Sequence, residues 1–113
     1  MHELSLMEAV RQQALAAALA DGASRITAIR LQVGQQSGVE PEALRFAFPV
    51  VMAGTIAAAA ELCLEIEPAE CHCQPCNLTF PAPYGCCDCP RCGTISRRLI
   101  RGRELRLLAL EVE

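Results

Sequence analysis

The placement of the cysteines is the feature that most constrains the fold of this chain. Seven of the eight cysteines lie between Cys71 and Cys92, and only Cys63 lies outside that stretch. A disulfide scaffold usually distributes its cysteines along the whole chain. The N-terminus also lacks the basic region and apolar run of a secretory signal. We therefore expect a reducing, cytoplasmic compartment, in which clustered thiols are typical metal ligands.

Two Cys-x-x-Cys pairs stand out within the cluster: Cys73 with Cys76, and Cys89 with Cys92. Two residues between thiolates let both sulfurs reach one ion, and two such pairs give a tetrahedral four-sulfur site of the structural zinc type. The same four thiolates suit iron in a rubredoxin-like site. We expect structural Zn(II) in a closed site, which leaves no coordination position open for catalysis.

The pairing of the second half of this site has an alternative. Cys86 and Cys89 also form a Cys-x-x-Cys pair, but the Cys89–Cys92 pair has a proline inside it and Gly93 directly after it. Glycine, and to a lesser degree Asn77 after the first pair, suits the positive φ that such turns need. We expect His72 and the remaining thiols of the cluster not to be metal ligands. These thiols are Cys71, Cys86 and Cys87.

The rest of the chain alternates between helical and strand periodicity, which predicts an α+β fold with two helices packed on a three-stranded sheet. Helices are expected from about Leu4 to Ala20, with Met7, Val10, Ala14 and Ala17 on one stripe, and from Pro41, where Ser37 or Glu40 caps the start. Pro49 predicts a kink or an early end of the second helix. Strands are expected at 27–33, at 61–67 with Leu62, Leu64 and Ile66 inward, and in 102–113.

These elements divide the chain into two predicted domains. Residues 1–69 plus 99–113 form an α/β domain, and residues 70–98, which are rich in cysteine and proline, form an inserted zinc-ribbon-like lobe. The lobe has few large apolar residues, so metal binding is expected to supply much of its folding energy.

The first three residues, Met1, His2 and Glu3, form a second candidate metal site. A free α-amine, the His2 amide nitrogen and the His2 imidazole can wrap one ion in fused chelate rings, and Glu3 can supply a fourth donor. Square-planar nitrogen coordination suits Ni(II) or Cu(II) and does not suit zinc. Taken alone, this signal is weak, and a solvated terminal side chain is the more common explanation of such a histidine.

Four segments together resemble the HypA/HybF family of nickel metallochaperones for nickel-iron hydrogenase maturation: the opening MHELSL, the segment GVEPEALRFAF, the two Cys-x-x-Cys pairs and the ending GRELRLLALEVE. The resemblance covers essentially the whole chain in the same order. It implies Ni(II) as transient cargo at Met1, His2 and Glu3, with Glu40 as a further acidic residue near that terminus or simply as a helix-start carboxylate. It also implies structural zinc at Cys73, Cys76, Cys89 and Cys92.

The resemblance further implies a metal-delivery protein and not an enzyme. Its expected partners are a HypB-type GTPase and the hydrogenase large-subunit precursor, and a homodimer is possible. A net charge of −3 and the lack of a long apolar run argue against nucleic-acid and membrane partners. Two alternatives remain open on the residues: a zinc-ribbon module that binds protein or nucleic acid without nickel, and thiol or iron redox chemistry at the cysteine pairs.

Overall fold

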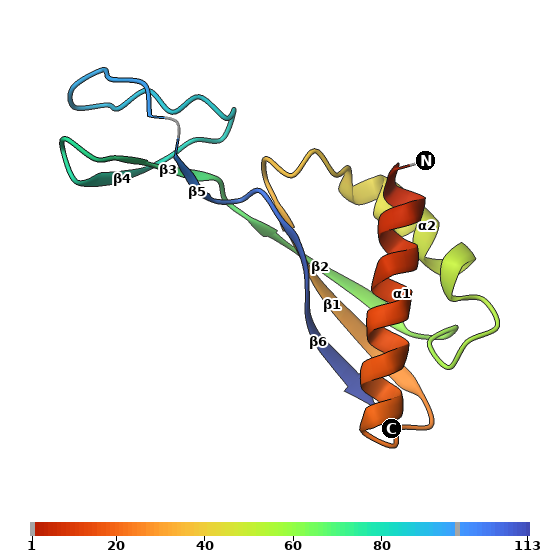
Figure 1. Cartoon of the computed structure of the whole chain (residues 1–113). Coiled ribbons are helices and arrows are strands. Elements are labelled where there is room, and N and C mark those ends of the chain that lie inside the picture. Colours follow the sequence, from red (N-terminus) through yellow and green to blue (C-terminus); the bar gives the residue numbers. More distant parts are fainter. Residues whose placement is uncertain (1, 97) are drawn as a thin grey trace. The chain divides into compact units, whose positions relative to one another are not determined.

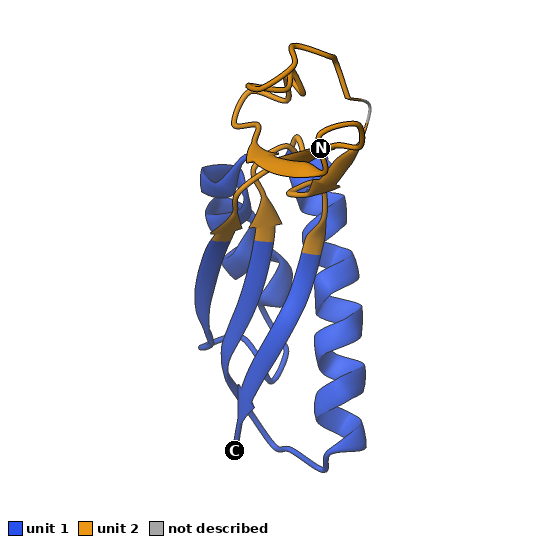
Figure 2. Cartoon of the chain, turned by 90° about the vertical axis from the view of Figure 1, so that its left-hand side faces the viewer, with its two compact units in different colours: residues 1–32, 39–65, 106–113 blue, residues 33–38, 66–105 orange. Residues whose placement is uncertain are grey.

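The computed structural model describes residues 2–96 and 98–113. The chain divides into two compact units, shown in different colours in Figure 2. Unit 1 comprises residues 1–32, 39–65 and 106–113, and unit 2 comprises residues 33–38 and 66–105. Within the described residues, no helix is both long and apolar enough to span a membrane.

Unit 1 contains both long helices and most of a three-stranded sheet (Figure 1). The helices are α1 (His2–Ala20) and α2 (Pro41–Met52), and they lie together on one side of the sheet (Figure 2). The strands have the order β2-β1-β6. Their bounds are Ile26–Gly34 for β1, Glu61–Glu67 for β2 and Leu105–Val112 for β6, and one end of each strand is counted with unit 2. This arrangement confirms the predicted α+β class.

The core of unit 1 is built from one stripe of α1 and one face of the central strand. The buried residues of α1 recur at intervals of three and four, which is the period of a helix with one apolar face: Met7, Val10, Ala14 and Ala18. The stripe ends at Ala18, so the prediction of Ala17 was wrong by one position, and Ala17 is exposed. In β1, Ile29 and Leu31 are completely buried while Arg30 between them is exposed, as the period of a strand requires.

Helix α2 begins as predicted but does not end early. Glu40 occupies the N-cap position and Pro41 follows inside the first turn. Pro49 lies within the helix, which continues to Met52. Of the two outcomes predicted at Pro49, a kink or an early end, the early end does not occur. The turn beyond the proline buries Val51 and Met52, and that burial outweighs one lost backbone hydrogen bond.

Replacing Pro49 with alanine is expected to stabilise the protein by about 1–2 kcal/mol. Alanine restores an N–H that can donate to the Arg45 carbonyl and removes the ring that crowds it, which outweighs the greater freedom of the unfolded chain. Thermal unfolding followed by circular dichroism measures the change. The neighbouring Val50→Ala, at another exposed position of the same turn, should stay within about 0.5 kcal/mol of the parent. A loss of stability in Pro49→Ala would contradict this account.

One inward position of β2 was also predicted wrongly. Leu62 and Leu64 are half-buried as expected, but Ile66 is 51% exposed. Ile66 is the first residue of β2 that belongs to unit 2, so it lies beyond the part of the sheet counted with the helices. The alternation of the sequence cannot show where along a strand its covering layer ends.

Unit 2 carries a second sheet of three short strands that the sequence did not predict. They are β3 (Glu70–Cys73), β4 (Leu78–Pro81) and β5 (Leu99–Arg101), in the order β4-β3-β5. Both partners run antiparallel to β3, and the β5 pairing shifts register beside Cys71. The buried cluster of this unit consists mainly of small residues and cysteines: Cys71, Cys73, Phe80, Ala82, Cys87 and Cys89. Cysteine sulfur thus replaces the aliphatic side chains that a larger core would use.

Candidate metal centre

Four cysteine sulfurs of unit 2 converge on one point. The Sγ atoms of Cys73, Cys76, Cys89 and Cys92 all lie within 4.8 Å of one another. Cys73 is the last residue of β3 and Cys76 lies in the turn that leads to β4, so these two form the first knuckle. Cys89 and Cys92 form the second knuckle, which is closed by an isolated bridge between Asp88 and Ile95. The structure thus brings together the four cysteines named from the sequence, and Cys86 is an exposed residue outside this set.

The turn geometry of both knuckles explains why these residues occur there. Asn77 after the first knuckle and Gly93 after the second have positive φ values of 48° and 74°, as predicted. The Gly93 amide donates to the Cys89 carbonyl at 2.9 Å. The Arg91 amide donates a hydrogen bond to the Cys89 sulfur at 3.4 Å. Each knuckle therefore turns the chain back on itself and directs two sulfurs to the same side.

The electrostatics of the four thiols favour a bound cation. The hydroxyl and backbone amide of Thr94 lower the pKa of Cys92 to about 6. Hydrogen bonding to the Cys92 sulfur, together with desolvation, raises the pKa of Cys76 to about 12. Because the sulfurs are so close, ionising one opposes the ionisation of the next unless positive charge lies among them. A divalent ion of the zinc type fits this donor set, and four protein thiolates would complete its tetrahedral shell.

The remaining candidate side chains of unit 2 have other partners. His72 lies in β3, and its Nδ1 is 3.0 Å from the Thr79 hydroxyl, so it is neither a loop residue nor a member of the sulfur cluster. Arg101, one of six arginines between residues 91 and 106, pairs with the Glu70 carboxylate at 2.9 Å. This pairing weakens the case for a basic surface that binds nucleic acid.

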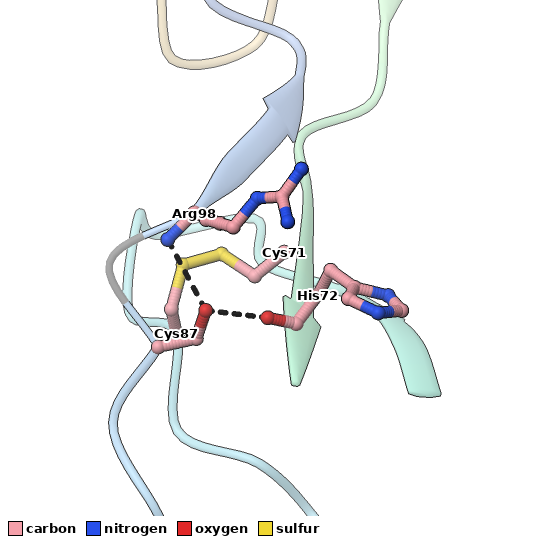
Figure 3. The surroundings of a disulfide bond; sticks show 5 residues. Cys71, His72, Cys87 and Arg98 are labelled. Atoms are coloured by element: carbon pink, nitrogen blue, oxygen red, sulfur yellow. Dashed lines mark hydrogen bonds between the residues drawn. A yellow bond between two sulfur atoms is a disulfide. The ribbon is translucent and has the colours of Figure 1, made fainter. Parts of the chain in front are cut away.

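Cys71 and Cys87, expected to be spare thiols, are joined by a disulfide bond (Figure 3). Their Cα atoms are 5.5 Å apart, which lies in the usual range for a disulfide. The sequence carries a signal for this pair. Each knuckle is preceded by one more cysteine in the pattern Cys-x-Cys-x-x-Cys, once from Cys71 and once from Cys87.

The second candidate site lies at the start of α1 in unit 1. Met1 lies outside the described residues, while the exposed His2 and the half-buried Glu3 are the first residues of the helix. The Glu40 amide donates to the Glu3 carboxylate at 3.4 Å, so the structure brings the starts of α1 and α2 together. Hydrogen bonds from the amides of Glu3 and Glu40 hold the pKa of the Glu3 carboxyl below its usual value. Glu3 is therefore an anionic donor next to His2.

An α+β unit and a four-cysteine lobe define a small protein of the metal-binding class, and the family match makes that class a metallochaperone and not an enzyme. The chain belongs to the HypA family: residues 1–112 match the family model described as "Hydrogenase/urease nickel incorporation, metallochaperone, hypA". The resemblance stated from the sequence is thereby confirmed.

Relatives and solved structures agree with this membership. The chain is 44% identical over 112 residues to the hydrogenase maturation factor HypA of Synechococcus elongatus, covering 99% of both chains. It is 39% identical over 112 residues to the same factor from Picosynechococcus sp., again covering 99% of both. Among solved structures, a solution structure of a HypA protein is similar with a TM-score of 0.75 and 25% identity, covering 100% of this chain and 97% of that one. The nickel metallochaperone HypA of Helicobacter pylori shares the fold, with a TM-score of 0.67 at 23% identity over 97% of this chain and 96% of that one.

Proposed function

We propose that this protein binds Ni(II) at Met1, His2 and Glu3 and delivers it for the maturation of a nickel-iron hydrogenase. The observation that carries the proposal is the match of residues 1–112 to a family described by nickel incorporation. The position of the terminal residues supports it. His2 is exposed at the start of α1, and an exposed site can release its ion to an acceptor more readily than a buried cage can.

The start of a helix also suits the proposed coordination. The first N–H groups of a helix have no partner within it, so the His2 amide is free to bind metal after it loses its proton. Glu40 is a candidate for a further ligand, because its amide contacts the Glu3 carboxylate and its own side chain makes no capping hydrogen bond. Its alternative role is that of a carboxylate favoured by the dipole of α2.

The four-cysteine centre is proposed to hold structural Zn(II) through Cys73, Cys76, Cys89 and Cys92. The zinc would then stabilise residues 70–98 as a separate lobe, with nickel handled by residues 1–69 and 99–113. The chemistry supports a permanent ion here, because thiolates bind zinc tightly and the site is complete without substrate. The two metals would therefore have different roles and different lifetimes on the protein.

The proposed partners follow from the family. They are a HypB-type GTPase that also handles nickel and the precursor of the hydrogenase large subunit, in the cytoplasm, with a homodimer as a further possibility. Nucleic acid is not proposed as a partner, since the net charge is −3. A membrane is not proposed either, since no apolar run of the sequence approaches the ~20 residues of a span.

Lengthening the chain by Gly-Ser ahead of Met1 tests the nickel assignment. The extension removes the α-amine from the chelate ring, so we expect the loss of stoichiometric Ni(II) binding while zinc content stays the same. Isothermal titration with Ni(II) and elemental analysis of untagged protein measure both. A matched protein with Gly-Ser after Glu113 should bind nickel as the parent does. Undiminished nickel uptake by the N-terminally extended protein would refute the proposal.

A further inference from the structure

Two of the four cysteines that the proposed metal sites do not use, Cys71 and Cys87, lie in the core of unit 2, directly beside the knuckles. Cys71 is completely buried and Cys87 is 7% exposed. Along an extended strand the side chains of residues i and i+2 lie on the same face, so Cys71 lies on the same face of β3 as Cys73. Cys87 likewise precedes Cys89 by two residues. The disulfide therefore joins the same two segments that the metal would join.

A network of hydrogen bonds holds these two segments together independently of both sulfur sites. The Ser96 hydroxyl donates to the His72 carbonyl and accepts from the Arg98 amide. The Ser96 amide donates to the Cys87 carbonyl at 2.8 Å, and the His72 amide donates to the Arg98 carbonyl at 3.1 Å. Cys71 and Cys87 are thus kept close enough to pair without long-range movement.

We propose that Cys71 and Cys87 form a reversible redox site whose disulfide preserves the fold of the lobe when the four-cysteine metal is absent. The inference assumes that those four cysteines bind metal, but it does not depend on nickel. The lobe then has two alternative cross-links between the same pair of segments, the Cys71–Cys87 disulfide and the four-cysteine metal. In the dithiol form the metal is the one remaining cross-link between these segments, beside their hydrogen bonds.

The proposed reactant is a small thiol–disulfide couple of the glutathione type. Glutathione thiolate attacks the Cys87 sulfur, the less buried of the two, and the Cys71 sulfur leaves and takes up a proton. A second glutathione thiolate then attacks the glutathione sulfur of the mixed disulfide, so that glutathione disulfide is released and the Cys87 sulfur leaves and takes up a proton. The protein gains two electrons and two protons, and two glutathione molecules are oxidised to one disulfide. The reverse sequence restores the bond.

The expected effect on the lobe follows from loop closure. The bond closes a loop between cysteines sixteen positions apart, and constraining an unfolded loop of about that length changes the folding equilibrium by roughly a hundredfold. Proteases cleave in proportion to the open population when opening is fast, so the metal-free dithiol lobe should be cut at least about tenfold faster than the metal-free disulfide lobe.

The first measurement asks whether the pair exists and is reversible. Full-length protein freed of metal by a chelator is equilibrated in glutathione buffers of different ratios, then alkylated and digested for mass spectrometry. We expect a Cys71–Cys87 linkage in oxidising buffer that disappears in excess glutathione. A pair that never forms, or one that no excess of glutathione opens, would overturn the proposal.

The second measurement asks whether the bond protects the lobe. Limited proteolysis compares the metal-free disulfide and dithiol forms of the native chain, and the sites of cleavage are read by mass spectrometry. Equal rates of cleavage within residues 70–98 would overturn the proposal. The double variant Cys71→Ala with Cys87→Ala should behave like the dithiol form even in oxidising buffer, and Cys63→Ala in β2 should behave like the native chain. If the double variant does not fold, the cleavage rates of the disulfide and dithiol forms of the native chain still test the proposal. Zinc content is measured separately, so the absence of bound zinc would refute the zinc assignment without deciding the redox result.

Discussion

His2→Ala is expected to abolish stoichiometric Ni(II) binding while zinc content and fold remain unchanged. The substitution removes the imidazole and leaves only the amine, the amide nitrogens and Glu3 as donors. The six-membered chelate ring that the imidazole closes with the His2 amide nitrogen is therefore lost. We expect at least a hundredfold loss of affinity, which corresponds to about 2.7 kcal/mol. The side chain of His2 is exposed, so thermal stability should change by less than about 0.5 kcal/mol. Calorimetric titration and elemental analysis measure binding, and circular dichroism measures stability.

His72→Ala is the matched control for that experiment. His72 is the other of the two histidines in the chain, and it lies in β3 against Thr79. If nickel binds at the terminus, this variant should keep its full nickel stoichiometry. Equal nickel binding by native protein and His2→Ala would exclude the terminal site. Loss of binding in His72→Ala instead would place the nickel in the lobe.

In the reduced protein, Cys73→Ala is expected to remove bound zinc completely and to unfold much of unit 2. Cys73 is 1% exposed and lies in the sulfur-rich cluster that replaces an aliphatic core. Without its sulfur, three donors remain at a site whose metal contributes free energy on the order of 10 kcal/mol to folding. The zinc content measured by elemental analysis should therefore fall from one equivalent per protein to none. Hydrogen exchange should accelerate in residues 70–98 of the reduced protein, while helices α1 and α2 remain protected.

Cys86→Ala is the control for the zinc site, since Cys86 is exposed and forms the competing Cys-x-x-Cys pair with Cys89. It should retain one equivalent of zinc. Loss of zinc from Cys86→Ala with retention in Cys92→Ala would show that the alternative pairing is used. Retention of zinc by Cys73→Ala would refute the four-cysteine assignment. Nickel binding at the terminus should survive in each of these variants.

Much of the candidate chemistry was predictable because it depends on neighbours in the chain. Two cysteines separated by two residues can reach one ion whatever surrounds them, and a turn with Gly93 favours that geometry locally. The terminal chelate likewise needs only consecutive residues, although its occupation by nickel is still to be measured. The long helix and the central strand β1 followed from periodicities of 3.6 and 2.

The sequence alone thus determined the four-cysteine pattern, the two helices, the strands of the larger sheet and the candidate terminal chelate. Only the tertiary structure decided that α2 continues through Pro49, that Glu40 lies against Glu3, and that Cys71 pairs with Cys87. The reason is physical. Local spacing fixes which groups can act together within one turn, whereas contacts between distant segments depend on the burial and hydrogen bonding of the whole unit. Three strands as short as β3, β4 and β5 carry too little periodicity to predict, and they become visible only when their backbone partners are in place.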